Sequence, residues 1–171
     1  MKRVFGIAGW SGSGKTTVLT ALIPALIARG QTVSTIKHAH HDFDIDRPGK
    51  DSFRHREAGA HEVMIGSGYR FALMHELRDG STEPSLGDLV ARLAPVDLVL
   101  VEGFKFDPIP KLEVHRPSVG KPPIWPDDPH IVAVASDIAL ARCDRPVLDL
   151  ADTEAIADLV ARDARPLEAA P

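Results

Sequence analysis

The sequence predicts an α/β fold of three layers, with helices covering a mainly parallel central sheet and a β-hairpin at its periphery. Runs rich in Val, Ile and Leu alternate along the chain with segments of helical periodicity, which is the pattern of a parallel sheet. The segment DLVLVEGF, residues 97–104, is apolar almost throughout, as expected of a strand covered on both faces. We expect one nucleotide-binding domain over residues 1–164 and a loose tail over 165–171.

The individual elements follow from local patterns. Short apolar runs rich in β-formers predict strands at residues 4–8, 32–37, 61–67, 69–76, 97–104, 111–116, 130–136 and 146–150. Apolar residues at helical spacing predict helices at residues 15–29, 85–93 and 153–162, and a short helix that ends at Ala58, with Asp51 or Ser52 as its N-cap. Gly68 lies between two expected strands and predicts the hairpin, whereas the proline-rich segment 117–129 is expected to be irregular.

Composition excludes several classes of protein. Asp and Glu (24) outnumber Lys and Arg (20), which argues against a general nucleic-acid-binding protein because such proteins carry an excess of basic residues. The single cysteine, Cys143, excludes an intramolecular disulfide and fits a reducing cytoplasm. No stretch approaches the ~20 apolar residues of a membrane-spanning helix, and glycines interrupt the apolar run near the N-terminus. We therefore expect a cytoplasmic protein that binds neither nucleic acid nor membrane.

The most specific motif is the loop GWSGSGKT, residues 9–16, which matches the pattern G-x-x-x-x-G-K-[ST] without a mismatch. Gly12 and Gly14 permit the close backbone approach that lets several N–H groups face a triphosphate. The following helix adds the unpaired N–H groups of its first turn. Lys15 is expected to contact the β- and γ-phosphates and Thr16 to offer its hydroxyl to Mg²⁺. Because the loop lies between a strand and a helix, nucleotide binding is favoured over a chance Gly/Ser turn.

A magnesium-triphosphate site also needs an acidic group at the end of a neighbouring strand. Glu102 ends the apolar strand LVLVE, so it is expected to hold Mg²⁺ or one of its waters. The alternative is that Glu102 only terminates the strand. An acidic residue at the end of a strand covered on both faces needs a partner, and this favours the metal role.

A cluster of polar residues follows the second expected strand and comprises His38, His40, His41, Asp42, Asp44 and Asp46. A zinc site would need three or four converging side chains, and the spacing does not show them. Two further interpretations stay open, a solvated loop and a switch-like loop near the γ-phosphate, since loops at the carboxyl ends of parallel strands line the ligand crevice. Asp46 is our choice for a contact to Mg²⁺ or its water, with Asp42 and Asp44 as alternatives.

Asp137 ends the expected strand VAVAS. Its carboxylate is suited to accept hydrogen bonds from N1–H and N2–H₂ of guanine, a pair of donors that adenine lacks. The alternative is that Asp137 caps a helix, and the residues alone leave both open.

Six segments between residues 9 and 137 give the chain a family resemblance: GWSGSGKTT, IKHAHHDFDIDRPGKDS, REAGA, RFALM, DLVLVEGFK and IVAVASD. With these segments the chain resembles the MobB family, the P-loop proteins of molybdopterin-guanine dinucleotide biosynthesis. The His-rich segment and VEGFK are more specific than the phosphate loop. One departure is Ala39, which stands where a more polar residue often lies between the histidines.

The resemblance implies a GTP-binding adapter, usually a homodimer, that assists the guanylyltransferase joining GMP to molybdopterin. It also implies, at most, slow GTP hydrolysis. Carried over to this chain, the phosphate loop comprises Gly12, Ser13, Gly14, Lys15, Thr16 and Thr17. Glu102 then matches the acidic strand end, Asp46 the aspartate before PGKDS, and Asp137 gains support as the residue that recognises the base.

Two other functions compete with the GTP-binding adapter. A small-molecule kinase uses the same phosphate loop but places an acceptor hydroxyl in line with the γ-phosphate. A pure interaction module would use the nucleotide only to fix its shape. Rapid, metabolite-dependent formation of ADP or GDP would indicate the kinase. Intact cofactor maturation with Lys15→Ala would indicate the interaction module.

Overall fold

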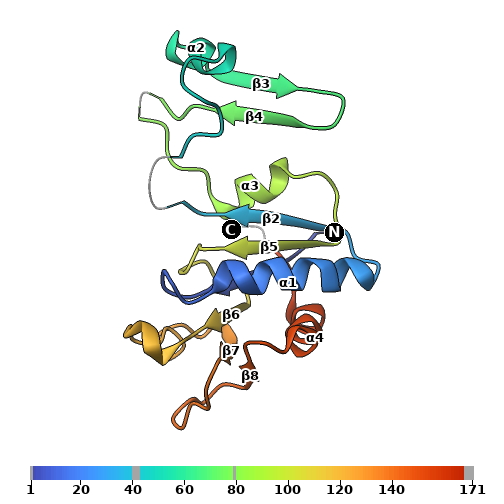
Figure 1. The fold of residues 1–171 in the computed structure, drawn as a ribbon, viewed down its shortest axis with the longest axis vertical. Helices are drawn as coiled ribbons and strands as arrows, with labels where there is room; N and C mark the ends of the chain where they lie inside the picture. The colour runs from blue at the N-terminus through green and yellow to red at the C-terminus, as the bar shows by residue number, and fades with distance from the viewer. Residues whose placement is uncertain (1, 40–42, 79, 168–171) are drawn as a thin grey trace. The chain divides into compact units, whose positions relative to one another are not determined.

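The computed structural model describes residues 2–39, 43–78 and 80–167, which fall into two units (Figure 1). Unit 1 comprises Met1–His38 and Ser85–Pro171, and unit 2 comprises Ala39–Pro84. The sequence predicts one domain over 1–164, so the division is a feature that its patterns do not show. Among the described residues, no helix has the length and apolar character needed to cross a bilayer.

Unit 1 is built on a seven-stranded sheet in which β1 lies between β5 and β6. Its strands are β1 (Arg3–Ala8), β2 (Val33–Lys37), β5 (Leu98–Glu102), β6 (Lys111–Val114), β7 (Ile131–Ser136), β8 (Val147–Asp149) and β9 (Arg165–Pro166). The order is β2-β5-β1-β6-β7-β8 with all neighbours parallel, and β9 pairs antiparallel with β1. This arrangement confirms the predicted α/β fold with a mainly parallel sheet. The pairing of β9 orders two residues of the segment expected to be a loose tail.

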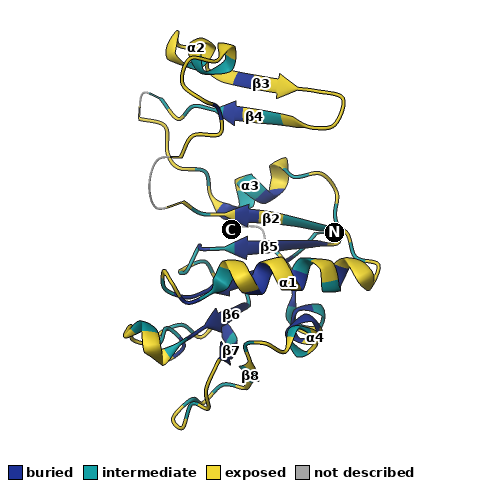
Figure 2. Ribbon diagram, in the orientation of Figure 1, coloured by how far each residue is buried: buried dark blue, intermediate teal, exposed yellow. Residues whose placement is uncertain are grey.

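Helices cover both faces of this sheet because side chains alternate between the faces along each strand. The helices of unit 1 are α1 (Lys15–Ala28), α3 (Leu86–Arg92) and α4 (Thr153–Asp163). Phe5 and Ile7 of β1 pack with α1 and α4 on one face. Val4 of β1 and Val99 of β5 pack with α3 on the other. The central strands are accordingly coloured as buried in Figure 2, and the three predicted layers are present.

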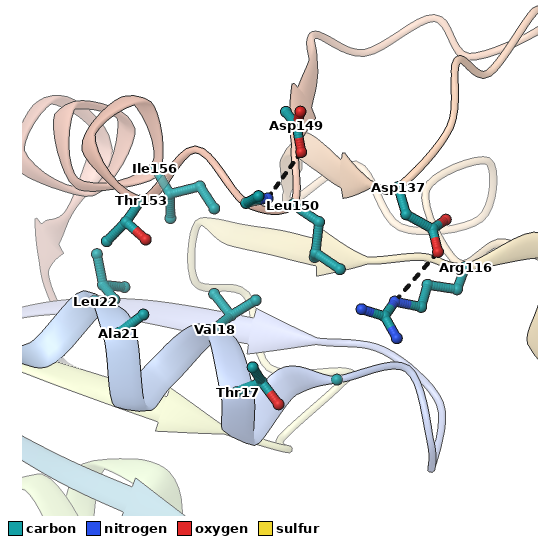
Figure 3. A pocket seen from close by; sticks show the side chains of 12 residues that line it. Thr17, Val18, Ala21, Leu22, Arg116, Asp137, Asp149, Leu150, Thr153 and Ile156 are labelled. Atoms are coloured by element: carbon teal, nitrogen blue, oxygen red, sulfur yellow. Dashed lines mark hydrogen bonds and ion pairs between the residues drawn. The ribbon is translucent and has the colours of Figure 1, made fainter.

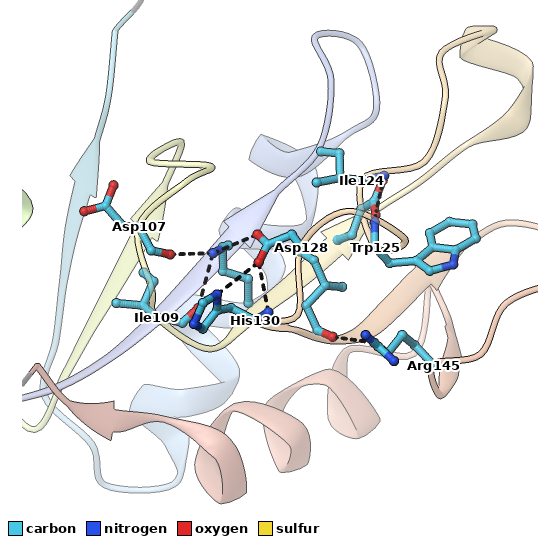
Figure 4. A network of polar contacts seen from close by, with 10 residues as sticks. Asp107, Ile109, Ile124, Trp125, Asp128, His130 and Arg145 are labelled. Carbon is cyan, nitrogen blue, oxygen red and sulfur yellow. Dashed lines mark hydrogen bonds and ion pairs between the residues drawn. The ribbon is translucent and has the colours of Figure 1, made fainter.

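Two charged side chains of β6 are fully buried and fix the proline-rich segment that follows (Figure 4). The Lys111 ammonium donates to Asp107 O at 2.6 Å and lies 3.0 Å from Asp128 Oδ2. The Glu113 carboxylate accepts from the backbone N–H groups of Ile124, at 2.9 Å, and Trp125, at 2.8 Å. Buried charges of this kind need partners, and the segment expected to be irregular supplies them from its backbone and from Asp128.

Unit 2 contains α2 (Asp51–Glu57) and the predicted hairpin, formed by β3 (Glu62–Gly66) and β4 (Phe71–His75). Val63 and Met74 face each other in the hairpin and are buried. Met64, Leu73 and Phe71 lie on its other face and remain 64%, 42% and 73% exposed. The N-cap of α2 is Lys50, with no side-chain cap bond, so the predicted cap at Asp51 or Ser52 is wrong. The helix begins at Asp51, which is one residue earlier than a cap at Asp51 would allow and two earlier than a cap at Ser52 would allow.

Candidate nucleotide-binding site

The glycine-rich loop joins the carboxyl end of β1 to the first turn of α1, and its glycines are required by geometry. Gly9, Gly12 and Gly14 have φ values of +141°, +83° and +100°. A Cβ on Gly9 would lie 2.5 Å from Val114 O, whereas a Cβ on Gly12 would meet nothing within 4 Å. Side chains therefore fit poorly at Gly9 for lack of space, and at all three positions because L-residues rarely adopt these dihedrals.

The same loop presents polar groups without partners. Ser13 is 2% exposed, and its Oγ has no hydrogen-bond partner among the described residues. Gly14 is the N-cap of α1 and provides no side-chain cap, and the first turn contains no acidic residue. The N–H groups of a helix start need acceptors, and the positive end of the helix dipole favours an anion. The loop thus meets the requirements of a phosphate site, as its sequence motif predicts.

Lys15 lies in a group of charged residues at the carboxyl edge of three neighbouring strands. Its ammonium donates to Trp10 O at 3.0 Å. Burial is the main cause that lowers the pKa of Lys15; Glu102 raises it, and Lys105 and Lys37 lower it further. Glu102 of β5 aligns with Lys37 in the neighbouring strand β2. On its other side it aligns with Ile7 of β1, two positions before the loop. The structure therefore brings Lys15 and Glu102 together, as both predictions require.

Trp10 connects the phosphate loop to two other loops. The Lys105 ammonium lies 4.1 Å from the centroid of its indole ring, in a cation–π contact. The indole Nε1–H donates to Pro122 O at 2.7 Å. Sequence reasoning missed this residue because the motif leaves its second position unspecified, and only a structure shows what a tryptophan there touches.

The segment after Glu102 makes a sharp turn. Gly103 has φ +95° and Phe104, unusually for a residue with a side chain, has φ +47°. A Cβ on Gly103 would lie 2.7 Å from the Cβ of His38, and the rings of Phe104 and His38 are 4.8 Å apart. The ends of β2 and β5 are thereby packed together next to Glu102.

A cavity of 370 Å³ opens beside the phosphate loop, within the ~300–1,000 Å³ typical of small-molecule sites (Figure 3). Gly14, Thr17 and Val18 of the loop and α1 form one wall. Leu150, after β8, gives the cavity further apolar surface, and Asp137, after β7, supplies a carboxylate. Asp137 and the predicted phosphate loop therefore line the same cavity.

Arg116, at the carboxyl end of β6, is a lining residue that sequence reasoning did not assign. Its Nε lies 3.5 Å from Asp137 Oδ2. Its Cζ would lie 3.7 Å from a Cβ on Gly14. The signal that could have identified Arg116 is its position, because it follows a parallel strand that neighbours β1.

Asp46 belongs to unit 2 and is engaged there by an arginine. Its carboxylate lies 3.0 Å from the guanidinium of Arg56, which also holds Asp44 at 2.8 Å. The side chain of Asp46 is only 2% exposed. This ion pair gives Asp46 a structural role within unit 2, and its contact to Mg²⁺ stays a prediction.

The other members of the polar cluster are described in part. His40, His41 and Asp42 lie outside the described residues. Among the residues that are described, no three His, Cys, Asp or Glu side chains converge as a metal site requires. For Mg²⁺, the remaining predicted ligands are the Thr16 hydroxyl at the start of α1 and the Glu102 carboxylate at the end of β5. Oxygen donors of this kind are what Mg²⁺ prefers.

A parallel sheet with a glycine-rich loop between its central strand and a helix defines the chain as an α/β protein of the P-loop NTPase-like type. The family model of MobB, described as molybdopterin guanine dinucleotide synthesis protein B, matches residues 4–137. The chain belongs to this family. The match ends at Asp137 and includes the phosphate loop and Glu102.

Relatives that are named for a role in the same pathway support this assignment. The molybdopterin-guanine dinucleotide biosynthesis adapter protein of Escherichia coli is 46% identical, over 92% of this chain and 90% of its own length. The adapter protein of the same name from Haemophilus influenzae is 45% identical, over 92% and 86%. A crystal structure of molybdopterin-guanine biosynthesis protein B matches with a TM-score of 0.72 and 26% identity, over 92% of this chain and 97% of that one.

Proposed function

We propose that this protein is a GTP-binding adapter of molybdopterin-guanine dinucleotide biosynthesis that assists the guanylyltransferase of that pathway. The observation that carries the GTP-binding part is the joint placement of the phosphate loop and the Asp137 cavity at the start of α1. The pathway part rests on the family and on the names of the adapter proteins from E. coli and H. influenzae.

Each end of a nucleotide has a matching group in unit 1. The amides of the loop, the Ser13 hydroxyl and Lys15 bind the phosphates. The cavity lined by Gly14 and Thr17 also contains Asp137. In this proposal the Asp137 carboxylate accepts hydrogen bonds from N1–H and N2–H₂ of guanine. Adenine offers no such pair of donors, so this arrangement favours GTP over ATP.

Magnesium completes the triphosphate site in this proposal. In unit 1 the Thr16 hydroxyl and Glu102 would hold the ion, which would neutralise charge on the phosphate oxygens. Lys15 supplies a second positive charge to the same oxygens. Its lowered pKa leaves less of it charged at alkaline pH than an ordinary lysine, so triphosphate affinity falls earlier as pH rises.

Hydrolysis by this site is expected to be slow. In-line attack of water on the γ-phosphorus breaks its bond to the bridging oxygen and yields GDP and phosphate. Glu102, at the end of β5, would orient the water. Arg116 lies beside the phosphate loop at Gly14, but its side chain faces Asp137. An arginine at the transition state is worth roughly 10³- to 10⁵-fold in rate, so a site whose neighbouring arginine is directed at Asp137 fits an adapter better than an efficient GTPase.

A homodimer is part of the proposal, with the hairpin of unit 2 as its contact surface. Met64, Leu73 and Phe71 form an apolar face on a two-stranded sheet. Such a sheet is marginal on its own, and a second copy of the same hairpin offers a complementary apolar face. Phe71→Asp is expected to yield a monomer in sedimentation experiments, while Tyr69→Asp, at a 97% exposed turn residue, serves as the matched control. An unchanged mass for Phe71→Asp would exclude this surface.

Calorimetric titration with Mg²⁺ and either GTP or ATP tests nucleotide binding. We expect saturable binding with a preference for GTP. Lys15→Ala removes a charge-assisted contact worth about 1.5–3 kcal/mol, so it should weaken GTP binding about 10- to 150-fold while the fold is retained. Lys121→Ala, at an exposed lysine, is the control. Absence of binding to either nucleotide, or equal binding of both, would contradict the proposal.

A further inference from the structure

The Arg116–Asp137 pair differs from a tight surface ion pair in several respects. It rests on one 3.5 Å separation, between Nε and Oδ2, and the two side chains are 37% and 42% exposed. The Nε atom itself is buried and has no hydrogen-bond partner among the described residues. A buried donor of this kind needs an acceptor, and the Asp137 carboxylate is the one beside it. Figure 3 shows the Arg116 side chain reaching toward α1 with that carboxylate at its Nε.

The same arginine also lies against the phosphate loop. Its guanidinium carbon is 3.7 Å from the position of a Cβ on Gly14, the N-cap of α1. Arg116 therefore spans the distance between the loop and the Asp137 carboxylate, and all three line one cavity. His115 comes from the same strand end; burial lowers its pKa, and the Asp137 carboxylate opposes this by raising it.

We propose that Arg116 is a positioning residue that determines base specificity by orienting Asp137 toward guanine. This inference rests on the proposed GTP-binding function. Asp137 follows β7 and is exposed, so its side chain has rotamer freedom that binding would have to remove. The Arg116 guanidinium donates toward the Asp137 carboxylate and restricts the rotamers of that side chain. Arg116 thereby pre-organises the two acceptor oxygens that N1–H and N2–H₂ of guanine require.

Because Arg116 is proposed to act through Asp137, its loss should weaken the binding only of nucleotides that contact the Asp137 carboxylate. ATP, which shares the phosphates and ribose with GTP, should be unaffected. A residue that touches the phosphates directly would change the affinity for both nucleotides by the same factor.

Titrations of GTP and ATP with Mg²⁺ on the full chain test the inference with Arg116→Ala, Arg116→Lys, Asp137→Ala and the double variant Arg116→Ala/Asp137→Ala. We expect Arg116→Ala to lose up to about fivefold in GTP affinity, as for a partly exposed ion pair, with ATP affinity unchanged. Arg116→Lys, which keeps the charge without the planar fork, should lose less. The double variant should bind GTP as weakly as Asp137→Ala alone.

Other results would overturn the inference. Equal losses for GTP and ATP would make Arg116 a phosphate contact, and multiplied losses in the double variant would show that it acts independently of Asp137. Unchanged GTP affinity would remove its role altogether. A wild-type protein that binds no GTP, or binds ATP equally, would instead refute the function on which the inference rests. If thermal unfolding shows that Arg116→Ala is not folded, Arg116→Gln replaces it in the same titrations.

Discussion

Removing the acceptor of the buried lysine should destabilise unit 1 strongly. Lys111 is 0% exposed, and its ammonium has one carboxylate partner among the described residues, Asp128, whose side chain is 13% exposed. Asp128→Asn keeps the shape but leaves a buried positive charge uncompensated. Breaking a buried pair in this way costs about 3–5 kcal/mol, which for a chain of this size lowers the melting temperature by roughly 6–20 °C.

The reverse change should cost less, and the two together should not add. Lys111→Met removes the charge, while Asp128 keeps the N–H of His130 at 2.9 Å as a donor. The double variant Lys111→Met/Asp128→Asn buries no unpaired charge. We expect it to be more stable than the sum of the single effects by about 1–3 kcal/mol.

Urea unfolding followed by tryptophan fluorescence measures these free energies. Both tryptophans, Trp10 and Trp125, belong to unit 1, so the signal reports the unit that contains the pair. A loss below about 1 kcal/mol for Asp128→Asn, or additive effects in the double variant, would refute the reasoning. Such a result would mean that water or rearranged carbonyl groups solvate the Lys111 ammonium.

Three further predictions concern pH, base specificity and the proline-rich segment. Burial opposes the charged form of Asp128, but the His130 N–H and the Lys111 ammonium prevail and lower its pKa below 3.8. The stabilisation from Asp128 is therefore full above that value and is lost as pH falls through the folded-state pKa, and acid titration of Asp128→Asn should lack this loss. Asp137→Asn should shift the binding preference from GTP to xanthosine triphosphate, because the amide of asparagine donates to the C2 oxygen of xanthine. Competition binding measures this preference, and an unchanged preference would exclude Asp137 from the base site. Glu113→Ala leaves two backbone N–H groups without their acceptor and should lower the free energy of unfolding by about 2–4 kcal/mol. Urea unfolding measures this loss, which should be smaller for Glu113→Gln. Equal stability of Glu113→Ala and wild type would contradict the prediction.

The sequence predicts the elements of unit 1 well because their signals are local. The strand and helix at residues 4–8 and 15–29 are observed as Arg3–Ala8 and Lys15–Ala28, and α4 ends one residue beyond its expected bound. Nearly continuous apolar runs on strands covered on both faces leave little ambiguity. The same periodicity does not show that residues 39–84 form a separate unit, because unit boundaries depend on contacts distant in sequence.

The sequence indicates those residues of the candidate site that belong to a motif, but not those whose role depends on how the chain packs. The phosphate loop and Glu102 follow from spacing, since a triphosphate needs a fixed set of donors and an acid nearby. Arg116 and Trp10 act through neighbours, Asp137 and Lys105, that only the folded chain brings to them. Asp46 shows the opposite case, because its sequence context suggests a metal ligand while its observed contact is Arg56.

Unit 2 is an insertion in the crossover connection between β2 and β5. This connection contains α3, and residues 39–84 lie between β2 and α3. Strands β2 and β5 are hydrogen-bonded neighbours over Val33–Lys37, so the nucleotide fold is complete on either side of this insertion. A natural chain could therefore lengthen, shorten or exchange the inserted segment without rebuilding the phosphate loop. The inserted unit and the sheet of unit 1 are in this way free to change separately within one gene product.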